Sequence, residues 1–149
     1  MSARPLSAHP LNRLGIALLF AALVCWIGFH LLPIDHYMRG WELWKIIWLV
    51  LTSGSPPDWI TMIFISAFLT IAILVATSPF VTILLRSSKA CRWLAIGVSG
   101  AALLSVGSII LIAHAHPRAY ELLLAAMALN FVGLICLRAP RLETAPESP

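Results

Sequence analysis

The sequence has few charged residues and few cysteines. Asp, Glu, Lys and Arg make up only 11% of its 149 residues, whereas a soluble domain averages about 25%. So low a charge excludes an intrinsically disordered chain. The three cysteines include no Cys-x-x-Cys pair and are too few for a disulfide scaffold. Hydrophobic residues make up 60% of the chain and the mean hydropathy is +0.93, which together predict a membrane protein.

The sequence also lacks the motifs of common membrane enzymes and pumps. It has no His-Glu-x-x-His of an intramembrane metalloprotease and no Gly-x-Ser-x-Gly of a hydrolase. Its net charge of +4 is not gathered into a basic run with interleaved aromatics, so nucleic-acid binding is not expected. No charged residue lies in the middle of a long apolar run, which disfavours a proton-coupled transporter. We therefore expect neither an enzyme nor a resident cofactor.

Four long apolar runs occupy most of the chain: 14–32, 59–85, 93–113 and 119–137. A helix needs roughly 20 apolar residues to cross the hydrocarbon core, and the only charge within these runs is Glu121, near the start of the last. None of them alternates like a barrel strand. We predict an all-α membrane protein, with a four-helix transmembrane domain over 14–137 and polar tails at 1–13 and 138–149. The second tail is rich in proline and is expected to be disordered.

Two local signals refine the second run. Asp58 precedes it and can accept hydrogen bonds from the first-turn amides, so we expect it to be the N-cap. Pro79 lies inside the run and has no backbone N–H, so it is expected to kink the helix.

The basic residues predict the orientation. Cytoplasmic loops of membrane proteins carry an excess of Lys and Arg. Seven of the ten basic residues fall in the two tails and in the loop between the second and third runs, against three on the other side. Four of the six acids fall on that poorer side. Both termini are therefore expected in the cytoplasm, most economically at a bacterial inner membrane.

The outer loop 33–58 contains a tryptophan-rich segment. Residues 41–51 would reach only about 16 Å as a helix, so they cannot span the bilayer. Trp41, Trp44 and Trp48 share one helical stripe with Leu51, while Glu42 and Lys45 lie off that stripe and can pair. We expect a short amphipathic helix lying at the membrane interface. Its tryptophans either anchor it among the headgroups or form a docking surface for a partner.

Small and amide side chains predict where the helices pack. Small residues let transmembrane helices approach closely, and amides bond across them. The run 93–113 is therefore expected to be the packing helix of the bundle or a homodimer interface, and Asn130 is expected to point inward. The candidate packing residues are Gly97, Gly100, Ala101, Ser105, Asn130 and Gly133.

Four histidines fall on the expected outer side. Imidazoles and carboxylates can bind zinc, copper or nickel, and a pair of histidines on different helices can hold a haem. A metal- or haem-binding protein is therefore an alternative function, with His30 and His114 as the haem pair. The candidate ligands are His30, His36, His114 and His116.

A protein without catalytic or coupling residues can still act by binding another protein. Besides the bilayer, we expect a membrane or periplasmic protein partner, for which this chain is an accessory subunit or an immunity protein against a membrane-targeting toxin. That second role rests on an analogy of size and architecture alone. A small channel or transporter is a further alternative. The expected recognition residues lie in the outer loop: Trp41, Trp44, Trp48, Asp35, Arg39 and Glu42.

Overall fold

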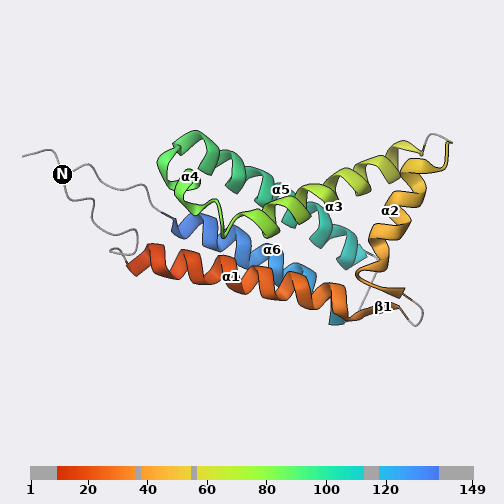
Figure 1. Ribbon diagram of the computed structural model, residues 1–149, viewed down its shortest axis with the longest axis horizontal. Helices are drawn as coiled ribbons and strands as arrows, with labels where there is room; N and C mark the ends of the chain where they lie inside the picture. The colour runs from red at the N-terminus through yellow and green to blue at the C-terminus, as the bar shows by residue number, and fades with distance from the viewer. Residues whose placement is uncertain (1–9, 36–37, 55–56, 113–117, 138–149) are drawn as a thin grey trace, which may run out of the picture.

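A computed structural model describes residues 10–35, 38–54, 57–112 and 118–137. Four helices are long and apolar enough to cross a membrane, as the sequence predicts: α1 (Pro10–Leu31), α3 (Trp59–Thr77), α5 (Lys89–Ile112) and α6 (Arg118–Cys136). They run along the long axis of the molecule (Figure 1). The chain is therefore built as a multi-pass membrane protein.

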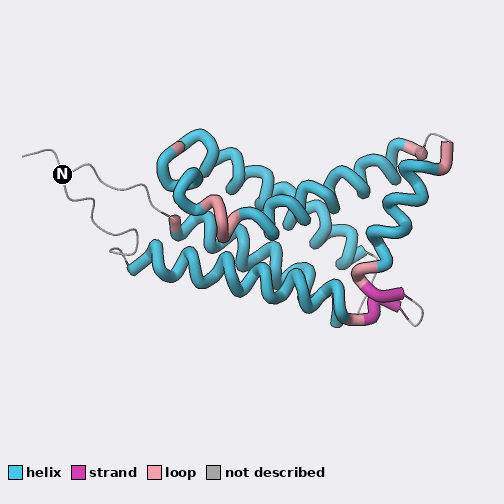
Figure 2. Tube along the Cα trace, viewed as in Figure 1, coloured by secondary structure: helices cyan, strands magenta, loops and turns pink. Residues whose placement is uncertain are grey.

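The start of α1 and the end of α6 lie at the same end of this bundle, where the short helix α4 (Thr82–Ser87) also lies. The opposite end carries a two-stranded hairpin, β1 (Pro33–Asp35) and β2 (Met38–Arg39), followed by helix α2 (Glu42–Thr52). Figure 2 shows the two strands beside α2. Helix α2 crosses this end of the bundle at a steep angle to the long helices (Figure 1).

The closest helix packing joins α1 and α6. A Cβ added at Gly15 would lie 2.9 Å from the carbonyl oxygen of Gly133, and one added at Gly133 would lie 2.9 Å from Leu19 Cδ2. Real Cβ atoms do not come so near, so the two backbones meet at this pair of glycines. Small residues allow such an approach between membrane helices. The tightest packing therefore involves Gly133, which the sequence indicated, and Gly15, which it did not.

Helix α5 packs less closely than the sequence led us to expect. Only 6% of its membrane-spanning window is buried, against 39% for α6. Gly100 does face Phe131 of α6, but a Cβ added at Gly97 would meet nothing within 4 Å. Ala101 and Ser105 are exposed, and the Ser105 hydroxyl donates to Ala101 O in its own helix. The small-residue stripe of α5 therefore faces outward over most of its length, and its role as a dimer interface stays a prediction.

A buried polar cluster links α5 and α6 to Ser78, the residue that follows α3. Asn130 on α6 is 1% exposed. Its side-chain oxygen accepts a hydrogen bond from the Ser78 hydroxyl, and its Nδ2 donates to Ser99 Oγ on α5 at 3.3 Å. A buried amide is costly unless it is bonded, so these contacts fix how α3, α5 and α6 meet.

The expected kink at Pro79 is a break. Helix α3 ends at Thr77, residues 78–81 form a turn, and α4 begins at Thr82. Proline cannot donate to the carbonyl one turn before it. The backbone N–H groups of Phe80 and Val81 instead both donate to Thr77 O, at 2.9 and 3.0 Å, which closes the turn.

At the other end of α3, Asp58 is the N-cap, and its carboxylate accepts from the Thr61 N–H at 2.7 Å.

Candidate functional site

The site lies where α2 meets the end of α1. The hairpin β1–β2 folds the chain back, with Pro33 opposite Arg39 and Asp35 opposite Met38. The N–H of Trp41 then donates to the carbonyl of His30 at 3.2 Å. The last carbonyls of a helix have no partner within it. The chain entering α2 therefore caps the end of α1, and this bond sets where α2 begins.

Gly40 makes this return possible. A Cβ at this position would collide with the backbone of α1, at the carbonyl group of Phe29 and the Cα of His30. These are main-chain atoms, which cannot turn aside as a side chain can. Only glycine brings the chain so near to α1 without displacing it.

His30 joins α1 to α2 through its side chain. Its Nδ1 lies 2.8 Å from Trp26 O, and its Nε2 lies 2.8 Å from the indole nitrogen of Trp44. A carbonyl only accepts and an indole N–H only donates. Nδ1 must therefore carry the proton and Nε2 must accept from Trp44. Both contacts together require the neutral imidazole with its proton on Nδ1.

Aromatic rings surround this contact. The ring of His30 packs against Trp26 and Phe29, with centroids 4.6 and 5.1 Å away. The ring of Trp44 lies edge-to-face with Phe68 of α3, at 5.3 Å. Edge-to-face ring pairs at this spacing are favourable. Trp44 is therefore held by one hydrogen bond to α1 and one ring contact to α3.

The three tryptophans of α2 do not act alike. Trp44 turns toward the bundle and is 38% exposed, whereas Trp48, one turn later, is 68% exposed. Trp41 is 42% exposed, and the ammonium group of Lys45 lies 4.3 Å from its ring centroid. The stripe predicted from the sequence is therefore divided: Trp44 anchors the helix, while Trp41 and Trp48 remain on its surface.

The charged residues of this region also make contacts of their own. Glu42 accepts a hydrogen bond from the Arg39 N–H at 2.8 Å, and Lys45 lies over Trp41. The pairing of Glu42 with Lys45 that their spacing favoured is replaced by these two contacts. Asp35 is the last residue of β1, opposite Met38 of β2. The structure thus brings Arg39 and Glu42 together at the start of α2, while Asp35 belongs to the neighbouring strand.

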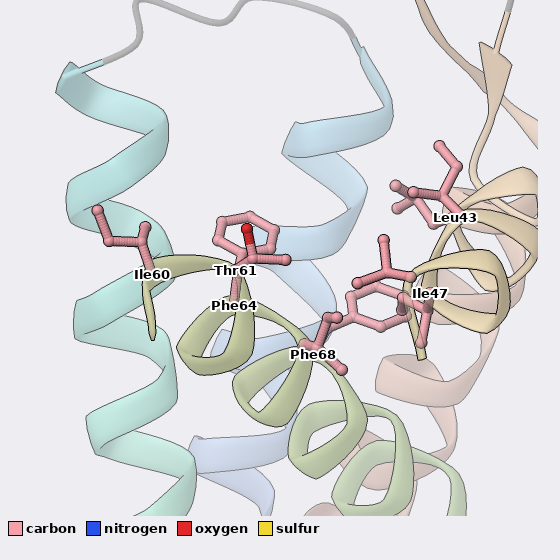
Figure 3. Close-up of a pocket in the computed structure, with 9 residues that line it drawn as sticks. Leu43, Ile47, Ile60, Thr61, Phe64 and Phe68 are labelled. Carbon is pink, nitrogen blue, oxygen red and sulfur yellow. The ribbon is translucent and has the colours of Figure 1, made fainter. Parts of the chain in front are cut away.

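An apolar groove separates α2 from α3 (Figure 3). Its volume is about 310 Å³. Leu43 and Ile47 enter it from α2, while Phe64 and Phe68 enter it from α3. Thr61 is the one lining residue with a polar side chain. Helix α2 therefore does not close against α3 along its length, and the groove offers no group for acid–base chemistry.

Three of the four candidate metal ligands lie outside the described residues: His36, His114 and His116. Because His114 is one of them, the proposed haem pair of His30 and His114 is not described as a pair. The fourth, His30, uses both ring nitrogens within the protein. Within the part of the chain that the structure describes, no three His, Cys, Asp or Glu side chains come together.

The buried polar residues among those described are uncharged: Asn12, Ser78, Ser99 and Asn130. Asp58 is exposed at the start of α3, where a hydrogen bond from the Thr61 N–H and a second from the Thr61 hydroxyl lower its pKa. Hydrogen bonds to a carboxylate favour its charged form. Asp58 is therefore accounted for by its capping role.

Comparison with known protein families, with curated proteins and with solved structures finds no match to this chain.

Proposed function

We propose that this chain binds another membrane or periplasmic protein through α2, at the outer face of the cell inner membrane. The charge distribution supports this orientation. Arg13, Lys89 and Arg92 lie on helices at the end of the bundle away from α2. The α2 end carries the acids Asp35, Glu42, Asp58 and Glu121 together with Arg39, Lys45 and Arg118. Cytoplasmic sides of membrane proteins are the basic ones. Both termini are then cytoplasmic and α2 faces outward.

The observation that carries the proposal is that α2 is fixed in place yet buries none of its residues. A backbone bond to His30, a side-chain bond to His30 and a close approach at Gly40 all set its position. A helix that served only as an anchor among lipids would need no such fixed geometry, because a fluid bilayer adapts to it. A surface that is rigid before binding loses less entropy when a partner docks. Tryptophan is one of the residue types enriched among the residues that contribute most binding energy at such interfaces.

Two roles fit this surface. An accessory subunit would stay with a membrane complex in undisturbed cells. An immunity protein would instead engage a pore-forming toxin and protect the cell from depolarisation. The partner distinguishes them: the first co-purifies from ordinary membranes, and the second only after the toxin has been supplied.

The experiment is affinity purification of the tagged chain from native membranes, with and without toxin-producing neighbours. The wild type is compared with the double variant Trp41→Ala/Trp48→Ala, which leaves the Trp44 anchor in place. We expect one protein to co-purify in fixed proportion with the wild type and to be lost from the double variant. Exposed substitutions change stability by less than about 0.5 kcal/mol, so expression and membrane insertion should be unchanged.

The matched control is Leu104→Ala on α5, which removes a side chain that is 74% exposed but lies on another helix. It should keep the partner. If the α2 double variant retained every protein that the wild type retains, α2 would not be the recognition surface.

The orientation has a separate test. Trp48→Cys should react with a membrane-impermeant maleimide added outside intact cells. The native Cys91 is exposed at the other end of the bundle and should react only after lysis. The reverse pattern would contradict the proposed topology.

A further inference from the structure

The bond between His30 and Trp44 cannot survive protonation of the imidazole. Nε2 accepts the indole N–H of Trp44 at 2.8 Å. An imidazolium carries protons on both nitrogens and has no acceptor left. Two N–H donors would then face each other, and the bond to α2 is lost.

The same proton leaves the other bond of His30 intact. Nδ1 already donates to Trp26 O at 2.8 Å, and an imidazolium donates there as well. His30 can therefore stay at the end of α1 while it releases α2. We propose that His30 is a pH-sensitive latch that holds α2 in its docked position when neutral and loosens it when protonated. The claim that the latch regulates partner binding rests on the proposed function. The claim that it holds and releases α2 does not.

Three features of the site favour a change confined to α2. His30 is only half-buried, so a proton can reach it from solvent. No residue of α2 is buried, and the groove between α2 and α3 leaves room for the helix to move. Trp44 also contacts the ring of Phe68 at 5.3 Å, and this contact does not depend on the proton of His30. Protonation therefore loosens α2 and does not unfold it.

Charged groups on the neighbouring elements bias this equilibrium. Carboxylates favour the imidazolium and cations oppose it. Several are already engaged: Glu42 with the Arg39 N–H, Lys45 with the Trp41 ring and Asp58 with Thr61. The charged groups on the elements around His30 are Glu42 and Lys45 on α2, Asp35 and Arg39 in the hairpin, Asp58 at the start of α3, and Arg118 and Glu121 on α6.

We expect α2 to be held while His30 is neutral and released when His30 is protonated, because only the neutral ring can accept from Trp44. A fixed helix binds a partner more tightly than a loose one. A hydrogen bond of this kind changes an equilibrium by roughly two- to tenfold, so acidification should weaken partner binding by about that factor.

The test is ¹⁵N NMR of the tryptophan indoles in the full chain, reconstituted in nanodiscs and titrated from pH 8 to pH 5. The Trp44 signal is identified by its absence from Trp44→Phe. At pH 8 its N–H should exchange with water more slowly than that of the exposed Trp48. As the pH falls, its exchange rate, corrected for intrinsic catalysis, should rise by roughly two- to tenfold.

Variants of the histidines isolate the responsible group. In His30→Gln the pH dependence of the Trp44 signal should disappear, because glutamine does not titrate in this range. In the variant with His9, His36, His114 and His116 all replaced by Gln, it should persist. The latch is wrong if Trp44 exchanges freely at pH 8, if its signal is unchanged down to pH 5, or if the pH dependence survives in His30→Gln.

This measurement needs no partner, so it separates the two proposals. If the Trp44 signal responds to pH but no protein co-purifies with the chain, the latch is supported and the proposed function is overturned. If a protein co-purifies in a way that depends on Trp48 but the Trp44 signal does not respond to pH, the proposed function is supported and the latch is overturned.

Discussion

The α1–α6 pair and helix α2 join the rest of the molecule in different ways. Between α1 and α6 the backbones themselves meet, at Gly15 and Gly133. Helix α2 is joined instead by its first turn and by Trp44, with Leu43 and Ile47 half-buried against the core. The first contact can be broken only by separating two long helices. The second can be released while α1 and α6 stay in place, as the proposed latch at His30 requires.

The largest expected effect comes from breaking the α1–α6 contact. In Gly15→Ala the new Cβ would lie 2.9 Å from the carbonyl oxygen of Gly133, an atom that cannot move without its helix. Overpacking of this kind costs about 2 kcal/mol, and we expect the Tm in detergent to fall accordingly.

Gly97→Ala is the matched control, because the same methyl group on α5 meets nothing within 4 Å. Alanine also favours a helix more than glycine does, so its Tm should stay level or rise. Equal losses in the two variants would contradict the packing described for α1 and α6.

The next effect comes from the buried polar cluster. Asn130→Leu removes the partner of Ser78 and Ser99 and should cost about 1 kcal/mol, typical of an interhelical bond in a membrane protein. Equilibrium unfolding in mixed micelles measures the loss. Ser105→Ala should have little effect, since that hydroxyl is exposed and bonds within its own helix. A variant at Asn130 as stable as the wild type would show that the cluster does not hold the three helices together.

A smaller, local effect is expected at Gly40, where the chain returns to α1 before α2 begins. Gly40→Ala places a methyl group against the backbone of α1 at Phe29 and His30, so the start of α2 must move away. We expect Trp44 to lose its slow indole exchange even at pH 8. The Tm should fall less than in Gly15→Ala, because α2 can move away while the α1–α6 contact is untouched. A large fall in Tm would mean that α2 is part of the bundle's stability and not an attachment to it.

The smallest effect concerns the cap of α3. The pKa of Asp58 is lowered by its hydrogen bonds from Thr61, so the folded chain binds this proton less readily than the unfolded one. The stabilisation is fully present above the ordinary carboxyl pKa and is lost as the pH falls through the lowered value. In wild type, the Tm should therefore decline slightly further below pH 4 than in Asp58→Ala. Parallel pH profiles for the two proteins would contradict the capping role.

The sequence alone predicted the features that depend on local composition. Long uncharged runs gave the four spans, and Asp58 before such a run gave the cap of α3. Pro79 marked the irregularity in the second run, but the loss of one donor could not distinguish a kink from the break that forms. The hairpin 33–39 was missed because its two short strands carry no alternating pattern.

The candidate site was predicted in its parts but not in its arrangement. Helical periodicity placed Trp41, Trp44 and Trp48 on one stripe, yet it could not say which of them meets another element. That depends on Gly40, which brings the chain back to α1, and on His30 lying one turn beyond Trp26. The sequence indicated His30 only as a metal or haem ligand, since its two hydrogen bonds include a contact between segments separated by the hairpin.

Site-specific photo-crosslinking in native membranes tests the central claim most directly. A photoreactive amino acid at position 48 of α2 is compared with one at position 104 of α5, both of which replace highly exposed side chains. We predict that position 48 forms a discrete adduct with one other protein, while position 104 reacts with lipid. Lipid adducts alone at both positions would contradict the account and leave α2 as an anchor in the bilayer.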